Sequence, residues 1–110
     1  MASVIRGSDN FDSLVHQGIG VNQTWQDVTA SRSAGTTYTN TTGKPIMLAI
    51  RFGDSSTGGG SCYVTVDGIQ VGYYQLYTGY DDTFTCIVPN GSTYSFTLIS
   101  MNMMFFRELR

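Results

Sequence analysis

Charged side chains are scarce in this sequence of 110 residues. Asp, Glu, Lys and Arg make up 13% of the chain, against roughly 25% in an average soluble domain. Six basic and eight acidic side chains give a net charge of -2, and Lys44 is the only lysine. A protein that binds nucleic acid through its phosphates needs a surplus of basic side chains. We therefore expect no nucleic-acid partner.

Long hydrophobic runs are also missing. No apolar stretch approaches the ~20 residues that a spanning helix needs, so insertion into a membrane is not expected. The first residues show no charged region followed by a long apolar stretch, and no signal peptide is predicted. A chain of this length builds one domain with a single core.

Side chains that commonly perform catalysis are few. His16 is the only histidine, and a Ser-His-Asp arrangement would have to recruit it from the N-terminal segment. The sequence contains no Gly-x-Ser-x-Gly, no phosphate-binding loop and no Gly-x-Gly-x-x-Gly motif. A glycosidase would need Asp81 or Asp82 to meet Asp54 or Asp67 at a set separation. We expect no catalytic residue and no enzyme, with His16 at a surface or an interface.

Metal and cofactor sites lack their usual ligand spacing. Asp9 and Asp12 lie close together, as do Asp81 and Asp82, but neither pair follows a calcium-loop pattern. The two cysteines, Cys62 and Cys86, have no Cys-x-x-Cys partner for zinc. No metal or cofactor is expected. Both cysteines are in phase with neighbouring apolar strand residues and should point into the core, as reduced thiols or as one disulfide.

What the sequence has in abundance is 14 Thr, 13 Gly, 11 Ser and a set of aromatic and β-branched residues, which favour strands over helices. Short alternating runs separated by turn residues recur at the spacing typical of a sandwich or jelly roll. We predict an all-β fold, an antiparallel β-sandwich, jelly-roll-like, of seven to eight strands. The predicted strands cover residues 21–29, 36–39, 46–52, 62–66, 69–71, 83–88, 93–98 and 101–109.

Turn residues predict how some of these strands connect. Asp67-Gly68 between residues 62–66 and 69–71 predicts a hairpin with a type I′ turn. Pro89-Asn90-Gly91 predicts a second hairpin between residues 83–88 and 93–98. The apolar run at residues 46–50 predicts a strand buried on both faces. Residues 1–20 are predicted to be an N-terminal arm or a short helical segment, and residues 21–110 the β-sandwich domain.

Residues 72–82 gather four tyrosines and two aspartates. A tyrosine offers a flat apolar ring with a polar tip, which suits stacking on a sugar while carboxylates accept hydrogen bonds from its hydroxyls. The glycine-rich loop 53–60 would form a rim. Strand alternation is the other interpretation, with Tyr73 and Tyr77 on one face and Tyr74 and Leu76 on the other, one of them in the core. The candidate binding residues are Tyr73, Tyr74, Tyr77, Tyr80, Asp81 and Asp82.

The stretch Met101-Asn102-Met103-Met104-Phe105-Phe106 is large, apolar and uncharged. A monomer rarely exposes a contiguous patch of this kind. A central strand buried on both sides explains it, and so does a subunit interface, where methionine and aromatic residues are enriched. The candidate interface residues are Met101, Met103, Met104, Phe105 and Phe106.

Four blocks of the sequence resemble blocks in tail fibre and related tail proteins of tailed bacteriophages and prophages. The first, at residues 20–32, reads GVNQTWQDVTASR, and the second, at residues 37–46, reads TYTNTTGKPI. Residues 88–94 and the closing residues 108–110 are the other two. The resemblance covers about residues 18–110 and implies a C-terminal β-domain. On physical grounds, Trp25 within its predicted strand would anchor the core.

The resemblance further implies a homotrimeric virion protein of the tail, assembled in the bacterial cytoplasm. It would attach the virion to a bacterial surface saccharide or outer-membrane protein through non-covalent contacts. The alternative function is a structural virion protein of the tail, baseplate or capsid decoration, without receptor contact. An exposed tyrosine cluster would favour the first of these, and burial of the cluster between chains the second.

Overall fold

The computed structural model describes residues 18–54, 59–77 and 80–110. Their regular structure consists of eight strands and one short 3-10 helix, η1 (Thr29–Ser31). The strands are β1 (Trp25–Asp27), β2 (Tyr38–Thr39), β3 (Ile46–Asp54), β4 (Gly60–Val66), β5 (Ile69–Leu76), β6 (Asp81–Val88), β7 (Thr93–Ile99) and β8 (Met101–Leu109). None of the described residues forms a helix that could span a bilayer.

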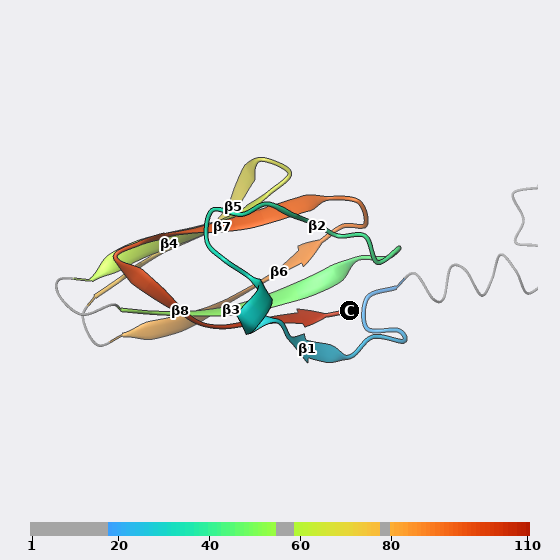
Figure 1. The fold of residues 1–110 in the computed structure, drawn as a ribbon, viewed down its shortest axis with the longest axis horizontal. Coiled ribbons are helices and arrows are strands. Elements are labelled where there is room, and N and C mark those ends of the chain that lie inside the picture. Colours follow the sequence, from blue (N-terminus) through green and yellow to red (C-terminus); the bar gives the residue numbers. More distant parts are fainter. Residues whose placement is uncertain (1–17, 55–58, 78–79) are drawn as a thin grey trace, which may run out of the picture.

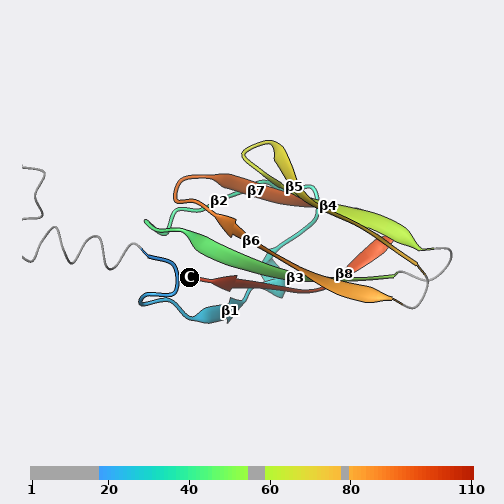
Figure 2. The same ribbon diagram turned by 180° about the vertical axis from the view of Figure 1, so that it is seen from behind.

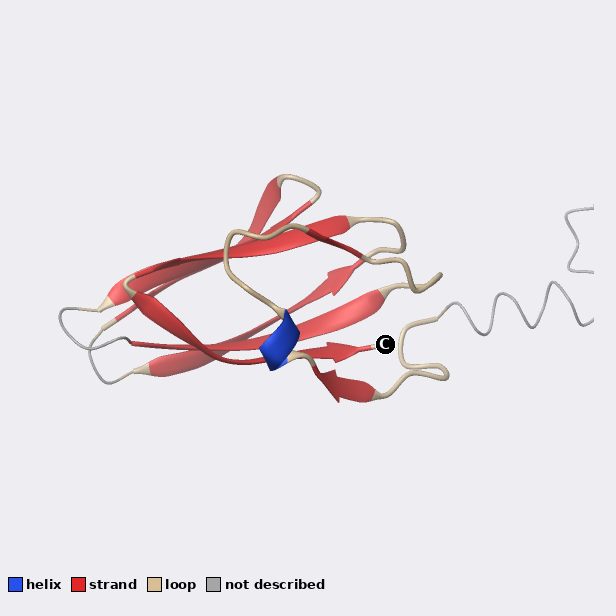
Figure 3. Ribbon diagram, in the orientation of Figure 1, coloured by secondary structure: helices blue, strands red, loops and turns tan. Residues whose placement is uncertain are grey.

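The strands form two antiparallel sheets that face each other (Figures 1 and 3). Sheet A has the order β1-β8-β3-β6, and sheet B has the order β2-β7-β4-β5. Seen from behind, β5 and β6 lie along the same side of the sandwich as the edge strands of the two sheets (Figure 2). The prediction of an all-β, antiparallel sandwich is confirmed.

Alternating side chains build the core between the sheets. Along β3, Ile46, Leu48, Ile50 and Phe52 are fully buried, and the residues between them are only partly so. The strand therefore has one core face and one outer face, and the prediction that it is buried on both faces is wrong. From sheet B, Phe96 packs between the rings of Phe52 and Phe106, with ring centres 6.2 and 5.4 Å apart.

The predicted hairpin at Asp67-Gly68 is confirmed. β4 and β5 pair with Val66 opposite Ile69, and both turn residues have positive φ, 52° for Asp67 and 80° for Gly68. Positive φ at both central positions is the requirement of a type I′ turn. The Asp67 carboxylate accepts hydrogen bonds from the Ser92 hydroxyl and the Thr93 amide, and these bonds lower its pKa.

The predicted second hairpin is wrong. β6 pairs with β3 in sheet A, whereas β7 pairs with β2 and β4 in sheet B. The turn at residues 89–91 carries the chain from one sheet to the other. A turn signal reports that the chain reverses direction, but it does not report that the two flanking strands share hydrogen bonds.

Trp25 does not anchor the core. It begins β1, a three-residue edge strand much shorter than the predicted strand over residues 21–29, and its side chain is 51% exposed. Trp25 pairs with Leu109 of β8. On that strand Phe106 and Glu108 are buried and point into the core, so Leu109, which follows Glu108, points to the opposite face. The indole therefore lies on the outer face of sheet A.

Two buried polar groups join distant segments at one end of the sandwich. The Asn40 amide nitrogen donates to the carbonyl oxygens of Lys44, Val88 and Pro89 at 2.8–3.1 Å, and its oxygen accepts from Thr42. The Glu108 carboxylate, which is fully buried, binds Arg32 at 2.9 and 3.1 Å and Arg110 at 2.6 Å. These contacts fix the loops that flank both sheets.

The predicted domain boundary at residue 20 stays a prediction. Residues 1–17, which include His16, Asp9 and Asp12, lie outside the described part of the chain. Residues 18–24 are bonded to the sandwich: Gln23 donates to the Pro45 carbonyl at 2.8 Å, and the backbone of Thr24 exchanges two hydrogen bonds with Arg110.

Candidate functional site

The outer face of sheet B carries most of the exposed tyrosine of the described chain, and we call it the tyrosine face. Its side chains alternate with the buried residues of β4 and β7 and with the partly buried residues of β5, and therefore point away from the core. Its members are Ser61, Tyr63, Thr65, Gln70, Tyr73, Gln75, Tyr77, Thr93, Ser95, Thr97 and Ile99. None of these described residues is charged.

Strand register arranges these side chains in rows. Tyr63 of β4 lies opposite Tyr73 of β5 on one side and Thr97 of β7 on the other. In the neighbouring row, Ser61 lies between Gln75 and Ile99. Directly opposed residues in an antiparallel pair have β-carbons about 5 Å apart. Two tyrosines are thus neighbours across the strands, flanked by hydroxyl and amide groups.

The rings along β5 are accessible. Tyr73 is 53% exposed and Tyr77 is 67% exposed. The two are four residues apart on the same side of the strand, a separation of about 13 Å at ~3.3 Å per residue. Gln75 lies between them and is exposed as well. The edge strand of sheet B therefore presents two exposed tyrosine rings, Tyr73 and Tyr77, with the amide side chain of Gln75 between them.

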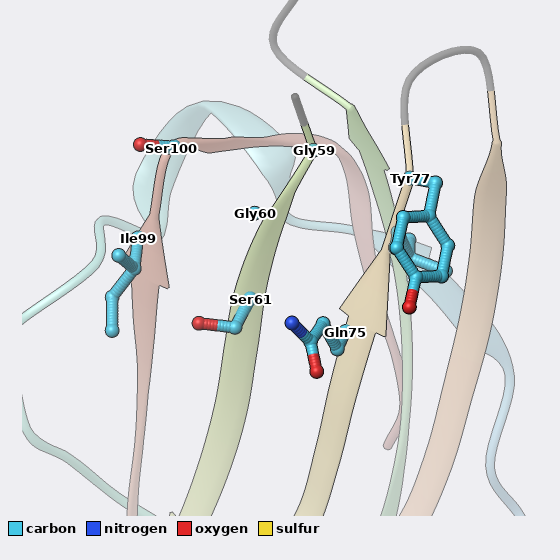
Figure 4. A pocket seen from close by; sticks show the side chains of 8 residues that line it. Gly59, Gly60, Ser61, Gln75, Tyr77, Ile99 and Ser100 are labelled. Atoms are coloured by element: carbon cyan, nitrogen blue, oxygen red, sulfur yellow. The ribbon is translucent and has the colours of Figure 1, made fainter. Parts of the chain in front are cut away.

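A depression of about 190 Å³ lies at the end of the tyrosine face. Figure 4 shows Ile99, Ser61 and Gln75 side by side across β7, β4 and β5, with the ring of Tyr77 beyond Gln75. Gly59 and Gly60 belong to its lining. A β-carbon at Gly60 would overlap the carbonyl oxygens of Ile99 and Ser100, and one at Gly59 would overlap that of Leu76.

Only part of the predicted tyrosine cluster reaches this face. Tyr74 points inward, where it packs against the core and meets the ring of Phe84 edge-on at 6.0 Å. Burial raises the pKa of Tyr74. The sequence predicted Tyr73 and Tyr77 on one face of the strand and Tyr74 and Leu76 on the other. The burial pattern of β5 agrees, because Tyr73 is exposed whereas Tyr74 and Leu76 are partly buried.

Tyr80, Asp81 and Asp82 follow the turn into sheet A. Tyr80 is exposed, and its amide donates to the Tyr77 carbonyl at 3.0 Å. Asp81 forms an ion pair with Arg51 of β3, and the Asp82 carboxylate accepts from the Thr83 amide at 2.8 Å. Asp81 and Asp82 therefore belong to the edge strand of the other sheet, and Tyr80 lies between Tyr77 and that strand.

The predicted interface stretch is also divided between two faces. Met101 and Phe106 are buried, and Met103 packs against the core, so these three form the inner side of a central strand. Their assignment to a subunit interface is corrected by this burial. Met104 is 51% exposed, and the ring of Phe105 lies under the Arg107 guanidinium at 3.9 Å.

Sequence reasoning missed Tyr63, Ser61 and Gln75. The available signal was the alternation of residues 62–66, in which Tyr63 is out of phase with the buried Cys62 and Val64.

The described residues contain no group of three or more His, Cys, Asp or Glu side chains that could hold a metal ion.

Comparisons with known proteins identify relatives of the fold. No family model matches the chain, and no curated protein matches it. A solved structure that matches is the CBM36-1 domain of a multidomain xylanase from the hindgut metagenome of Trinervitermes trinervoides. It is 11% identical, has a TM-score of 0.52, and the alignment covers 81% of this chain and 97% of that domain.

Two further solved structures match less closely. A carbohydrate-binding module CBM36 in complex with calcium and xylotriose is 14% identical with a TM-score of 0.45, covering 87% of this chain and 95% of the module. A family 35 carbohydrate-binding module from an environmental isolate is 18% identical with a TM-score of 0.37, covering 86% and 66%. Of the three, the CBM36-1 domain, with a TM-score of 0.52, shows that the sandwich fold is shared.

These comparisons correct the predicted family. The matching structures are carbohydrate-binding modules and not phage tail proteins. The resemblance to tail fibres is therefore wrong, and so are the functions of virion attachment and virion structure and the location in a virion tail. The homotrimer, which that resemblance implied, loses its basis as well.

Proposed function

We propose that the protein is a non-catalytic carbohydrate-binding module that holds a glycan chain against the tyrosine face. The observation that carries the proposal is the line Tyr73, Gln75 and Tyr77 on an exposed, uncharged strand face. The apolar faces of sugar rings stack on tyrosine, while sugar hydroxyls exchange hydrogen bonds with amide and hydroxyl groups.

The depression beside Tyr77 supports the same proposal. Gly59 and Gly60 add no side chain to its lining, and Ser61 and Gln75 supply polar groups. Because the tyrosine face has no charge, it suits a neutral glycan better than an acidic one. The matched xylanase domain has the same sandwich architecture, which makes xylan the first glycan to test.

The test is binding to insoluble xylan and to a panel of neutral and acidic polysaccharides, followed by calorimetry with the soluble form of any glycan that binds. Tyr73→Ala and Tyr77→Ala should each weaken binding about tenfold or more, because truncating a central contact residue costs on the order of 2 kcal/mol. Thr85→Ala, an exposed change on the opposite sheet, is the matched control.

Absence of binding to every glycan of the panel would overturn the proposed function. Binding that survives in both tyrosine variants would overturn the assignment to the tyrosine face. Tyr80→Ala should weaken binding less than Tyr77→Ala does, because Tyr80 lies outside β5 and the tyrosine face, although its amide donates to the Tyr77 carbonyl. Far-ultraviolet circular dichroism of each variant confirms that the sandwich is intact.

A further inference from the structure

The outward side chains along β5 and the residue that follows it repeat one pair of chemical groups. From the hairpin turn onward they run Gln70, Tyr73, Gln75 and Tyr77, so that an amide precedes a tyrosine ring twice. All four side chains are exposed, and residues 70–77 contain no charge. A surface that offers the same two groups in repetition suits a ligand that is itself built of repeating units.

A β-bulge is what makes this line continuous. Alternation alone would place Gln70 on the inner face, because an odd number of positions separates it from Tyr73. The register between β4 and β5 shifts after Val64, and Gln70 lies opposite Thr65. Tyr73 lies opposite Tyr63, which shares the outer face of β4 with Thr65. Gln70 and Tyr73 therefore share the outer face of β5. Bulges are over-represented beside active sites, where they re-aim a side chain.

The exposed rings favour a ligand that lies along the strand and not across the sheet. Tyr73 and Tyr77 are about 13 Å apart at ~3.3 Å per residue. Across the sheet, Tyr73 faces Tyr63 with the β-carbons about 5 Å apart, and the next residue of that row is Thr97. Tyr63 is also partly buried between its two neighbouring strands. A chain that crossed the strands at this row would leave the ring of Tyr77 without a sugar.

We propose that an extended glycan chain lies lengthwise on β5 and stacks on Tyr73 and Tyr77 at the same time. The inference rests on the proposed function and specifies its ligand. A disaccharide is too short to stack on both rings, so the site recognises a segment of several sugars and not a single sugar. The amides of Gln70 and Gln75 lie beside the two rings, where they exchange hydrogen bonds with the hydroxyls of neighbouring sugars.

Calorimetry with xylo-oligosaccharides of two to six sugars tests the length that is recognised. If another polysaccharide of the panel is the one that binds, oligosaccharides of the same lengths are cut from it. The affinity should rise about tenfold or more between two sugars and five, because only the longer chain gains the second stacking contact. Tyr77→Ala should remove this gain but change the binding of two sugars little, since these can still stack on Tyr73. Tyr77→Phe keeps the ring and should keep the gain, as should the control Thr85→Ala.

Tyr63→Ala separates the two directions of the chain. On a lengthwise chain this variant should keep the gain from two sugars to five. A gain that disappears in Tyr63→Ala and persists in Tyr77→Ala would mean that the chain crosses the strands, and it would overturn the proposal. Equal affinities for two sugars and six would also overturn it, while leaving glycan binding intact. Absence of binding at every length and to every polysaccharide of the panel would overturn the proposed function together with this inference.

Discussion

Gly72 of β5 faces the ring of Phe84 of β6 so closely that a β-carbon at position 72 would overlap the ring. Phe84 also meets Tyr74 edge-on. These contacts join the edge strands of the two sheets beneath Tyr73. Gly72→Ala should lower the free energy of unfolding by about 1–3 kcal/mol, the usual cost of overpacking a core. Urea unfolding measures it.

A double-variant cycle isolates the cause. Phe84→Leu removes the obstructing ring, so Gly72→Ala should cost less in that background than in the wild type. An equal cost in both backgrounds would show that the methyl group acts through the backbone of β5 and not through the ring.

Glu108→Gln should be among the most destabilising single changes on the chain. It removes the negative charge that partners Arg32 and Arg110, and the Arg32 side chain is only 12% exposed. Breaking a buried ion pair from one side costs about 3–5 kcal/mol. Asp81→Asn breaks the exposed pair with Arg51 and should cost less than about 1 kcal/mol. Similar losses of unfolding free energy in the two variants would contradict the expectation.

Asn40→Ala should destabilise the protein by about 1–3 kcal/mol or more, because the carbonyl oxygens of Lys44, Val88 and Pro89 lose their common donor. Asn40→Asp keeps the shape but turns three donated hydrogen bonds into contacts between oxygens. It should therefore be the more destabilising change at neutral pH. Differential scanning calorimetry gives both values, and an Asn40→Asp protein as stable as the wild type would refute this role of the amide.

Alkaline pH should weaken the fold in two overlapping stages. Burial raises the pKa of Cys62 and of Cys86 from 9.0 to about 11. Burial, together with the hydrogen bond to Glu108, raises the pKa of Tyr94 from 10.0 to about 12. For a pKa raised by folding, the contribution to stability is complete below the unfolded value and is lost as pH rises to the folded value.

The urea midpoint should therefore fall from pH 9 to 11 through the thiols and from pH 10 to 12 through Tyr94. Cys62→Ala combined with Cys86→Ala removes the first stage and keeps the second. Both thiols are free in the structure, so at pH 8 they should react with a thiol reagent only after unfolding. A midpoint that is flat from pH 8 to 12 would count against both stages.

Local patterns on the sequence predicted the local structure well. Asp67-Gly68 sets the hairpin because the turn and both partner strands lie within residues 60–76. The turn after Val88 carries an equally clear signal, yet β6 pairs with β3, and Val88 lies opposite Ile46, 42 positions earlier in the chain. Pairing between distant strands depends on the whole topology, which no short window contains.

The candidate site shows the same limit. Alternation separates Tyr73 and Tyr77 from Tyr74, so half of the cluster could be predicted from β5 alone. Tyr80, Asp81 and Asp82 are close in sequence but belong to the other sheet. Trp25 shows that a large apolar residue in a strand can face either way, because burial depends on which face another element covers.

Between successive described strands the chain changes sheet at every connection except the one from β4 to β5. Neither layer is therefore assembled from consecutive strands alone, because strands of the other sheet lie between its members along the chain. Contacts of this kind join residues far apart along the chain, which slows folding into the range of milliseconds to seconds. A chain cut between β5 and β6 should regain its shape only when both pieces are present together.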